Sequence, residues 1–447
     1  MALSRRRLIV GGTLTAAAGA FAPVVSFSEK VRPTLALWTD PNDWQSVRNQ
    51  FELDPAYIHL GLFFLASHPR PVREAIERLR GRLDRNPFLT VEQGMFEENM
   101  PKFYDAVTAA LARYAGVDAH DLALTSNTTT GLSLIYHGLP LGPGDEVLTT
   151  DQDHYVHHES IRLATERTGA TWRKIPIFSS YATISADEIV ERIRKGIAPK
   201  TRVVGITWVH SSIGLRMPVR RIADAIAEVN ARRGQQDRIL LVVDGVHGFG
   251  VEDPRLTELG ADLFSAGLHK WIFAPRGTGF VWAKADVWAT MRPLIPTFQT
   301  FDLFTAWAEG HPPRGRAHAA MFSPGGFQAY EHHWAVPPAI EFHERIGPAR
   351  ITQRIHSLNE PVREGLSKMP HVVTYTPSSS ELSAGMVCFD VKGLKAKETV
   401  GRLLKKKILA STTPYPVPFA RVAFGIMNTP AEVETTLRAV RELSAVG

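Results

Sequence analysis

Short apolar runs alternate with amphipathic segments along the chain, from about residue 70 to residue 285. Seven of the runs have the length of strands, at residues 122–125, 146–149, 171–177, 203–208, 239–243, 263–266 and 279–283. Several are apolar nearly throughout, which is typical of strands covered on both faces. The segments between them, such as ADEIVERIRKGI and VRRIADAIAEVNARR, repeat apolar residues at helical spacing. This alternation predicts an α/β domain built on a mostly parallel sheet.

The pattern changes in the last third of the chain. Residues 293–326 are rich in proline and glycine and interrupt the alternation. After them we expect a helix at about 335–346, strands near Val372 and at 386–391, and a last helix after Thr429. The chain is also longer than one hydrophobic core usually serves. We therefore predict an N-terminal arm (31–70), a large α/β domain (71–305) and a smaller α+β domain (306–447).

The N-terminal segment has the features of an export signal. Three arginines at positions 5–7 precede a mild apolar stretch at 8–22, which ends in an A-x-A-like processing sequence. The start of this segment, SRRRLI, resembles the twin-arginine signal of bacteria. An ordinary secretory signal or a short anchor are the alternatives, although the stretch is too rich in Gly, Ala and Thr for a good transmembrane helix. We predict a signal peptide at 1–30 and delivery to the periplasm by the twin-arginine machinery, folded and with any cofactor bound.

Composition narrows the possible partners. The formal net charge is +6, but part of the excess lies in the signal, and the basic run at 405–407 sits at a predicted helix end, where a solvated face explains it. The sequence has no nucleic-acid-binding motif, so we predict no nucleic-acid partner. Cys388 is the only cysteine, so no internal disulfide can form.

The segment SAGLHKWIFAPRGTGF places Lys270 in mostly apolar surroundings. Most such lysines extend their ammonium group to the surface. A lysine that is instead held without water can lose its proton and form an imine with a carbonyl cofactor. The residues near the other predicted strand ends distinguish these two interpretations, because ligands of open α/β sheets gather at the carboxyl ends of the strands.

Two polar sites follow predicted strands. Asp244, in LVVDGVHGFG, could pair with a protonated pyridine nitrogen, or it could be a turn or helix-capping residue. The glycines there do not form the dinucleotide-binding pattern. In TSNTTTGLSLI a strand passes into a helix, and free backbone N–H groups with the hydroxyls of Thr128 and Thr129 suggest a phosphate site.

Two further candidates complete the set. His154, in TTDQDHYVHHES, could lie flat on an aromatic ring. A metal site is the alternative there, although no standard zinc spacing is present; its ligands would be Asp153, His154, His157, His158 and Glu159. Arg421, in ARVAFGIMNTPAEVE, could clamp a carboxylate with two parallel hydrogen bonds.

The order of these sites along the chain resembles that of the class V aminotransferase family of fold type I pyridoxal-phosphate enzymes. The resemblance covers about residues 50–440 and is strongest for the isopenicillin N epimerase-like branch, whose lysine segment is similar to LHKWIFAPRGTGF. The segments LGPGDEVLTT, SPGGFQAYEHHWA and RVAFGIMNTPAEVE also resemble that family. It implies the PLP-dependent transferase fold type I, with a seven-stranded sheet and a smaller C-terminal domain, pyridoxal 5'-phosphate as cofactor, and a homodimer with shared active sites.

The resemblance assigns roles around the cofactor ring. It implies that Lys270 forms the internal aldimine and later moves protons, and that Asp244 pairs with the pyridine nitrogen. His154 would stack on the ring, and His247 lies where the family places a partner of the phenolic oxygen.

It also assigns the two ends of the ligand. The residues at phosphate-binding positions are Thr128, Thr129 and His269. Gly325 and Gly326 match a segment that reaches the phosphate of the neighbouring subunit in family dimers, and Arg421 matches the arginine that binds the substrate carboxylate.

The chain departs from the family's desulfurases around the substrate. Gly267 stands where the desulfurases have a serine, and His210-Ser211 where they have Ser-Asn. Leu62-Phe63-Phe64 stands where they have small glycine and serine residues near the entrance of the active site. The loop ASTTPYPVPFA carries no cysteine, and Cys388 lies in an apolar strand-like run, so we expect it to be buried and inert. The substrate therefore cannot be carried over from the desulfurases.

These features predict an exported enzyme that acts on the α-amino group of an amino acid or peptide-like metabolite. Aminotransferase-type chemistry, in the tailoring of a secreted metabolite, is the first expectation, with an epimerase and then a carbon–sulfur lyase as alternatives. From other classes, a non-catalytic binding protein on this fold and a metal hydrolase remain open.

Overall fold

The computed structural model describes residues 40–97, 102–253 and 255–443. All seven predicted strands are present and form one sheet in the order β2-β8-β7-β6-β5-β3-β4. Their bounds are β2 Leu122–Thr125, β3 Glu146–Thr150, β4 Thr171–Ile175, β5 Thr201–Thr207, β6 Leu240–Asp244, β7 Leu263–Gly267 and β8 Gly279–Ala283. Strand β8 runs antiparallel to both of its neighbours, and all other neighbours are parallel. The predicted α/β fold with a mostly parallel seven-stranded sheet is confirmed.

Both faces of this sheet are buried, as the apolar strands indicate. Leu241 and Val243 of β6 enter one apolar cluster, whereas Val242 between them enters the cluster on the opposite face. Alternation along a strand thus serves two cores at once. Strand β4 is the exception, because it lies at the edge of the sheet and leaves Thr171 and Lys174 exposed.

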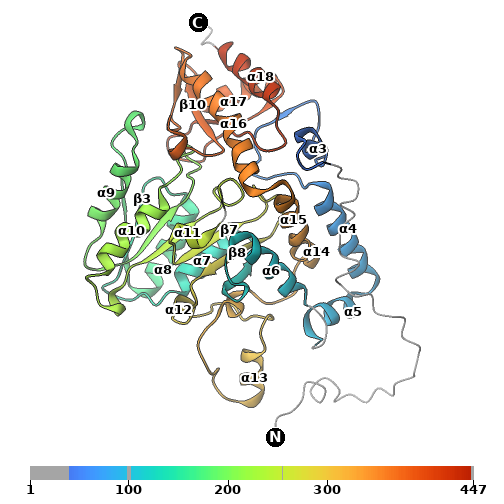
Figure 1. Cartoon of the computed structure of the whole chain (residues 1–447). Helices are drawn as coiled ribbons and strands as arrows, with labels where there is room; N and C mark the ends of the chain where they lie inside the picture. Colours follow the sequence, from blue (N-terminus) through green and yellow to red (C-terminus); the bar gives the residue numbers. More distant parts are fainter. Residues whose placement is uncertain (1–39, 98–101, 254, 444–447) are drawn as a thin grey trace.

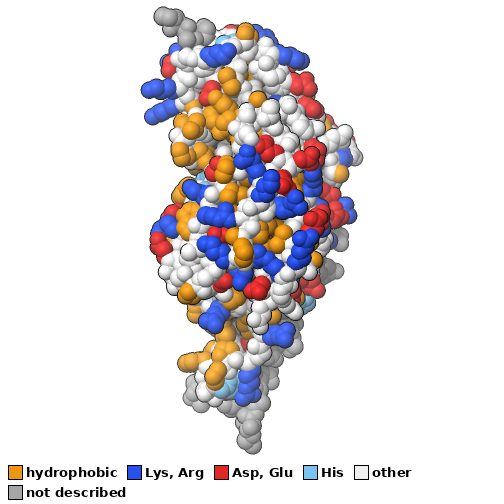
Figure 2. All heavy atoms as spheres, turned by 90° about the vertical axis from the view of Figure 1, so that its left-hand side faces the viewer, with side chains coloured by type: hydrophobic (Ala, Val, Ile, Leu, Met, Phe, Trp, Pro, Cys, Tyr) orange, Lys and Arg blue, Asp and Glu red, His pale blue; other side chains and the backbone are white. Residues whose placement is uncertain are grey.

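Helices cover the sheet and its flanks (Figure 1). Those of residues 70–346 are α4 Arg70–Arg85, α5 Pro87–Val91, α6 Phe103–Ala115, α7 Thr128–Gly138, α8 Tyr155–Thr168, α9 Ala186–Gly196, α10 Val219–Asn230, α11 Leu256–Leu259, α12 Ala285–Trp288, α13 Asp302–Glu309, α14 Tyr330–His333 and α15 Val336–Ile346. The amphipathic segments at 186–197 and 219–233 are α9 and α10. Figure 2 shows basic and acidic side chains interspersed on the face that carries these two helices, where Arg221 pairs with Asp187 and Arg194 with Glu191.

The C-terminal part forms a second, antiparallel sheet in the order β12-β13-β10-β9. Its strands are β9 Val372–Thr374, β10 Val387–Val391, β12 Ser411–Thr412 and β13 Ala420–Val422, and its helices are α16 Pro348–Ser367, α17 Ala396–Lys405 and α18 Pro430–Arg441. They lie at the top of Figure 1. Helix α18 begins where predicted, because Thr429 and Glu432 form a reciprocal capping box. The domain boundaries at 70 and 305 stay a prediction.

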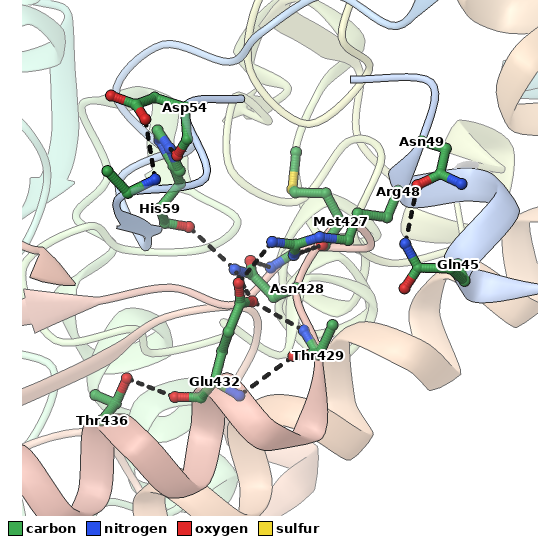
Figure 3. A network of polar contacts seen from close by, with 12 residues as sticks. Gln45, Arg48, Asn49, Asp54, His59, Met427, Asn428, Thr429, Glu432 and Thr436 are labelled. Carbon is green, nitrogen blue, oxygen red and sulfur yellow. Dashed lines mark hydrogen bonds and ion pairs between the residues drawn. The ribbon is translucent and has the colours of Figure 1, made fainter. Parts of the chain in front are cut away.

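The described part of the N-terminal arm is attached to this C-terminal part (Figure 3). Strand β1 (Ile58–His59) pairs in parallel with β11 (Ile408–Leu409). Arg48, at the end of α3 (Trp44–Arg48), donates to Glu432 at 2.8 Å and to the carbonyl oxygen of Met427. Asn428 donates to the carbonyl oxygen of His59 at 3.2 Å. The arm is thereby held beside the segment that follows β13.

The predicted signal peptide lies outside the described residues. Within the described ranges, no helix combines the length and the apolar character that crossing a membrane requires.

Candidate active site

A cavity of about 500 Å³ opens at the carboxyl ends of β2, β3, β5, β6 and β7. It is the location that open α/β sheets favour for ligands. The predicted site residues that line it are Thr128, Thr129, His154, Asp244, His247, His269, Lys270 and Arg421. Gly325 and Gly326 are not among the lining residues; they lie in the loop that precedes α14. The structure thus brings together every predicted site residue except these two glycines, while the individual roles stay predictions.

Lys270 lies in the turn after β7 and faces this cavity. Burial disfavours its ammonium form and lowers its pKa to about 8, helped by the positive charge of Arg421 and opposed by Asp244. Its Nζ lies 3.3 Å from His247 Nε2. A lysine that extends to bulk water would keep its ordinary pKa, so this geometry favours the nucleophilic interpretation over the surface one.

Asp244 is the last residue of β6 and is buried. Burial raises its pKa to about 6, although the hydrogen bond from Val246 N and the charge of Lys270 act in the opposite direction. Its Oδ1 accepts that bond at 3.1 Å, so Asp244 does form the local turn that was one of the two interpretations. Because burial deprives this carboxylate of its hydration, a cationic ring nitrogen is a suitable partner for its negative charge.

The start of helix α7 forms the phosphate end of the cavity. Asn127 caps the helix by accepting a hydrogen bond from Thr130 N at 2.9 Å, which leaves the earlier N–H groups for a ligand. Thr128 Oγ1 accepts from Gly267 N at 2.7 Å. A Cβ at Gly267 would lie 2.9 Å from the ring of His269, which explains the glycine at this position. His269 also lines this end of the cavity, and burial lowers the pKa of its imidazole.

His154 caps α8 and forms one wall. Its Nδ1 accepts from Val156 N at 3.4 Å. Burial, then Lys270 and Arg421, lower its pKa to about 4, so the ring is neutral at physiological pH. Tyr415 stands edge-on to this ring at 5.8 Å, and its Oη lies 2.9 Å from Ser211 Oγ.

Arg421, in β13, is buried and held from several sides. Its guanidinium lies 4.0 Å from the centre of the Phe63 ring. Nη1 donates to the carbonyl oxygen of Ser211 at 2.7 Å, and Nε and Nη2 donate to Ser411 Oγ at 3.3 and 3.2 Å. Because each terminal nitrogen carries two N–H groups, one N–H on each stays available for a substrate carboxylate.

The histidine-rich segment does not form a metal centre. Asp153 is buried and accepts from Thr150 Oγ1 at 2.7 Å and Thr207 N at 2.7 Å, with His157 Nδ1 at 3.7 Å. Glu159 instead pairs with Arg162 on the surface. Within the described ranges, no three His, Cys, Asp or Glu side chains are placed together to hold a metal ion. Asp153 anchors the loop that carries His154.

Sequence reasoning missed several lining residues. Ser126, Asn127, Arg276 and Tyr415 all face the cavity. Tyr415 lies between two prolines in the segment PYPVP, and prolines restrict the backbone. This was the one feature of the sequence that could have drawn attention to Tyr415. Phe63, Phe64 and Leu65 also line the cavity, in and next to the segment where the sequence departs from the desulfurases; Phe63 is buried, whereas Phe64 and Leu65 are exposed.

Comparison with known proteins identifies the family. The model of the family described as "Aminotransferase class-V" matches residues 67–435. The chain belongs to the class V aminotransferase family. Relatives include the isopenicillin N epimerases of Amycolatopsis lactamdurans, 28% identical over 424 residues (90% of this chain and 98% of the relative), and of Streptomyces clavuligerus, 28% identical over 422 residues (90% and 98%). A probable cysteine desulfurase of Xylella fastidiosa (strain Temecula1) is 25% identical over 381 residues (83% and 85%).

Solved structures have the same fold. A mutant of C-DES, with glycine covalently linked to its PLP cofactor, superimposes with a TM-score of 0.77 at 24% identity and covers 89% of this chain and 99% of its own. The cysteine desulfurase of Thermococcus onnurineus NA1 gives a TM-score of 0.74 at 20% identity (89% and 97%). The fold type I prediction is confirmed.

Pyridoxal phosphate is the cofactor of this class V enzyme, and the cavity fits it. The free N–H groups at the start of α7 suit the phosphate, with His269 lining the same end of the cavity, and Asp244 suits the ring nitrogen. Lys270 has the lowered pKa that covalent attachment to a carbonyl requires.

Proposed function

We propose that this class V enzyme moves a proton at the α-carbon of an amino acid or peptide-like metabolite and inverts that centre, as an epimerase. The observation that carries the proposal is Lys270 in the same cavity as Arg421, which retains two N–H groups for a carboxylate. The similarity to isopenicillin N epimerases over 90% of the chain supports it.

The residues of the chain divide the work. When bound, pyridoxal phosphate supplies a sink for the electrons released at the substrate carbon. Arg421 holds the carboxylate and so orients the α-carbon, and Lys270 Nζ takes and returns its proton. Asp244, which lines the same cavity, would hold the cofactor's ring nitrogen in its protonated form. Phe64 and Leu65 at the entrance limit the access of water.

Aminotransferase chemistry, the first expectation from the sequence, stays a prediction because it needs the same proton removal and differs in where the proton returns. Desulfurase activity is disfavoured because the only cysteine of the chain is not accessible to a substrate. Cys388 is fully buried in β10, and burial raises its pKa to about 12. Cys388→Ala should leave turnover of amine substrates unchanged, measured beside wild type; sulfide release from cysteine that disappears in this variant would contradict that placement.

Solvent isotope exchange tests the proposal. Amino acids and N-terminal peptides of both configurations are incubated with enzyme in D₂O, and deuterium at the α-carbon and the ratio of stereoisomers are followed. We expect deuterium incorporation together with inversion. Deuterium with amino transfer to an added 2-oxo acid, and no inversion, would establish an aminotransferase instead. No exchange with any substrate by cofactor-loaded protein would favour a non-catalytic binding protein.

As part of the proposal, the enzyme is a homodimer with shared sites. Large apolar side chains are exposed on neighbouring parts of the chain: Leu294, Ile295, Phe298, Phe304, Trp307 and Phe327. Two of them, Phe298 and Phe327, lie beside Gly325 and Gly326, the segment that the family resemblance directs to a neighbouring subunit. An exposed apolar surface of this kind is typical of an interface. The molar mass of the purified protein in solution, by light scattering, tests the dimer.

The proposal also assigns the enzyme to the periplasm, where it would tailor a secreted metabolite. The arginine pair and the apolar stretch of the N-terminal segment support this location.

A further inference from the structure

The residue after the catalytic lysine has a contact that the proposed reaction does not use. Trp271 is 1% exposed, and its Nε1 donates a hydrogen bond to His247 Nδ1 at 3.3 Å. The other ring nitrogen of His247, Nε2, lies 3.3 Å from Lys270 Nζ. Two adjacent residues of one turn therefore contact the two nitrogens of a single imidazole.

The chemistry of these groups determines the proton on His247. An indole N–H can only donate, so Nδ1 must accept and carries no hydrogen. A neutral His247 is then protonated at Nε2, the nitrogen that faces the lysine. Burial, followed by the charge of Lys270, lowers the pKa of His247 well below its usual value, which keeps the ring neutral.

The indole has little freedom to abandon this contact. Gly250 and Gly385 lie against it: an added Cβ would be 3.1 Å from Trp271 Cβ at Gly250 and 2.9 Å from Trp271 Cη2 at Gly385. Both glycines have positive φ, +91° and +52°. Backbone therefore lies against the outer edge of the indole at Gly385 and against the base of the side chain at Gly250.

We propose that Trp271 is a positioning residue that holds His247 as the Nε2–H tautomer, making this nitrogen a hydrogen-bond donor toward the cavity. The acceptors that this geometry suits are a neutral Lys270 amine and, when the cofactor is bound, an anionic oxygen beside it. Without the indole, His247 could place its proton on Nδ1 and present a lone pair to the same oxygen, which would repel it. The inference rests on the cofactor assignment and is independent of the reaction proposed above.

The test replaces Trp271 by phenylalanine, which keeps a buried aromatic ring and removes only the N–H donor. Trp282→Phe is the matched control, because Trp282 is also buried, lies on β8 outside the lining of the cavity, and its Nε1 has no partner among the described residues. The readout is the pH midpoint of the visible absorption band of bound pyridoxal phosphate, which titrates with the proton held beside its phenolic oxygen. Loss of a donor makes that oxygen more basic, so the midpoint should rise by about one pH unit in Trp271→Phe and stay at the wild-type value in Trp282→Phe.

Other titratable or charged groups also face His247: Lys270, Arg421, His154 and His269. These groups are the same in the wild-type and His247→Gln backgrounds. A double-mutant cycle of Trp271→Phe with His247→Gln therefore separates their effect from that of Trp271. A glutamine amide has a donor that needs no tautomer control. In the His247→Gln background, Trp271→Phe should therefore leave the midpoint unchanged. An equal shift in both backgrounds, or none in either, would overturn the inference.

A direct measurement guards against a variant that fails to fold or to bind the cofactor. In wild-type apoprotein labelled with ¹⁵N-histidine, the Nδ1 resonance of His247, assigned by its loss in His247→Gln, should be that of an unprotonated nitrogen. A protonated Nδ1 would refute the inference whatever the variants do. Wild-type protein that binds no pyridoxal phosphate would instead refute the cofactor assignment itself.

Discussion

At the scale of single residues, burial shifts the pKa values of the cavity's titratable side chains in favour of their neutral forms. The pKa of Lys270 falls to about 8, that of Asp244 rises to about 6, and that of His154 falls to about 4, in each case chiefly because water is removed. Each group is thus suited to a partner that the protein alone does not supply. A ring with a cationic nitrogen, an electrophilic carbonyl and a flat face provides one for each.

The lowered pKa of Lys270 predicts how the apoprotein takes up its cofactor. Only the neutral amine attacks a carbonyl, and a base with a lowered pKa becomes neutral as the pH rises through that value. The rate of covalent uptake of added pyridoxal phosphate, followed by absorbance in stopped flow, should increase with pH around a midpoint of about 8. Lys270→Ala should bind the cofactor without any covalent step. A midpoint near the ordinary lysine value would show that the side chain is solvated.

Asp244→Asn separates the two interpretations of this residue. Asparagine is of similar shape, and its side-chain oxygen can still accept the hydrogen bond from Val246 N, so the turn is preserved. The ring nitrogen loses its anionic partner. We expect retained cofactor and turnover reduced by about 100-fold or more, measured as kcat on the substrate found by isotope exchange. Near-normal turnover would make Asp244 a turn residue only.

The cofactor-facing residues were more predictable than the walls of the pocket. Asp244 ends a strand of the large sheet, Lys270 and Thr128 come shortly after two others, and the carboxyl ends of those strands meet at one edge. Tyr415 and Phe63 reach the cavity from segments far away in the sequence. No local pattern reports such contacts, because they depend on how the arm and the C-terminal sheet pack against the large sheet.

At the scale of elements, the pocket entrance depends on a contact between two ends of the chain. Residues 63–65 belong to the arm, and Arg48 and β1 attach this arm to α18 and β11. Glu432 is central, because its carboxylate accepts hydrogen bonds from Arg48, Asn428 and the backbone of Thr429. The start of α18 after Thr429 was predicted from the sequence, whereas the use of Glu432 as an anchor for the arm was not.

Glu432→Ala should therefore destabilise the protein more than a surface change. It removes the reciprocal cap and leaves the half-buried Arg48 without its carboxylate, and we expect a loss of about 1–2 kcal/mol in the free energy of unfolding, measured by urea titration. Glu434→Ala, an exposed change on the same helix, is the control and should cost a few tenths at most. Equal effects of the two changes would show that the network adds no stability.

At the scale of the whole molecule, the alternating pattern predicted the strands well and the connections less well. The continuous apolar run of a strand such as β6 predicts that both of its faces are buried. The direction of β8 is not visible, because an antiparallel strand buried on both faces has the same apolar run as a parallel one. The pairing of β1 with β11 joins segments some 350 residues apart, and two-residue strands leave no periodic signal.

Export in the folded state is the largest-scale prediction, and the chemistry of the mature protein makes it testable. Its single cysteine is buried in β10, so folding needs no oxidising compartment, and a cofactor bound before export would travel with the protein. Replacing Arg5 and Arg6 by lysine keeps the charge but removes the twin-arginine pair. We expect this variant to stay in the cytoplasm with its cofactor absorption intact, whereas Arg7→Lys, outside the pair, is delivered normally. Cell fractionation with absorbance of each fraction measures both, and continued periplasmic delivery of the Arg5/Arg6 variant would assign the protein to the general secretory route instead.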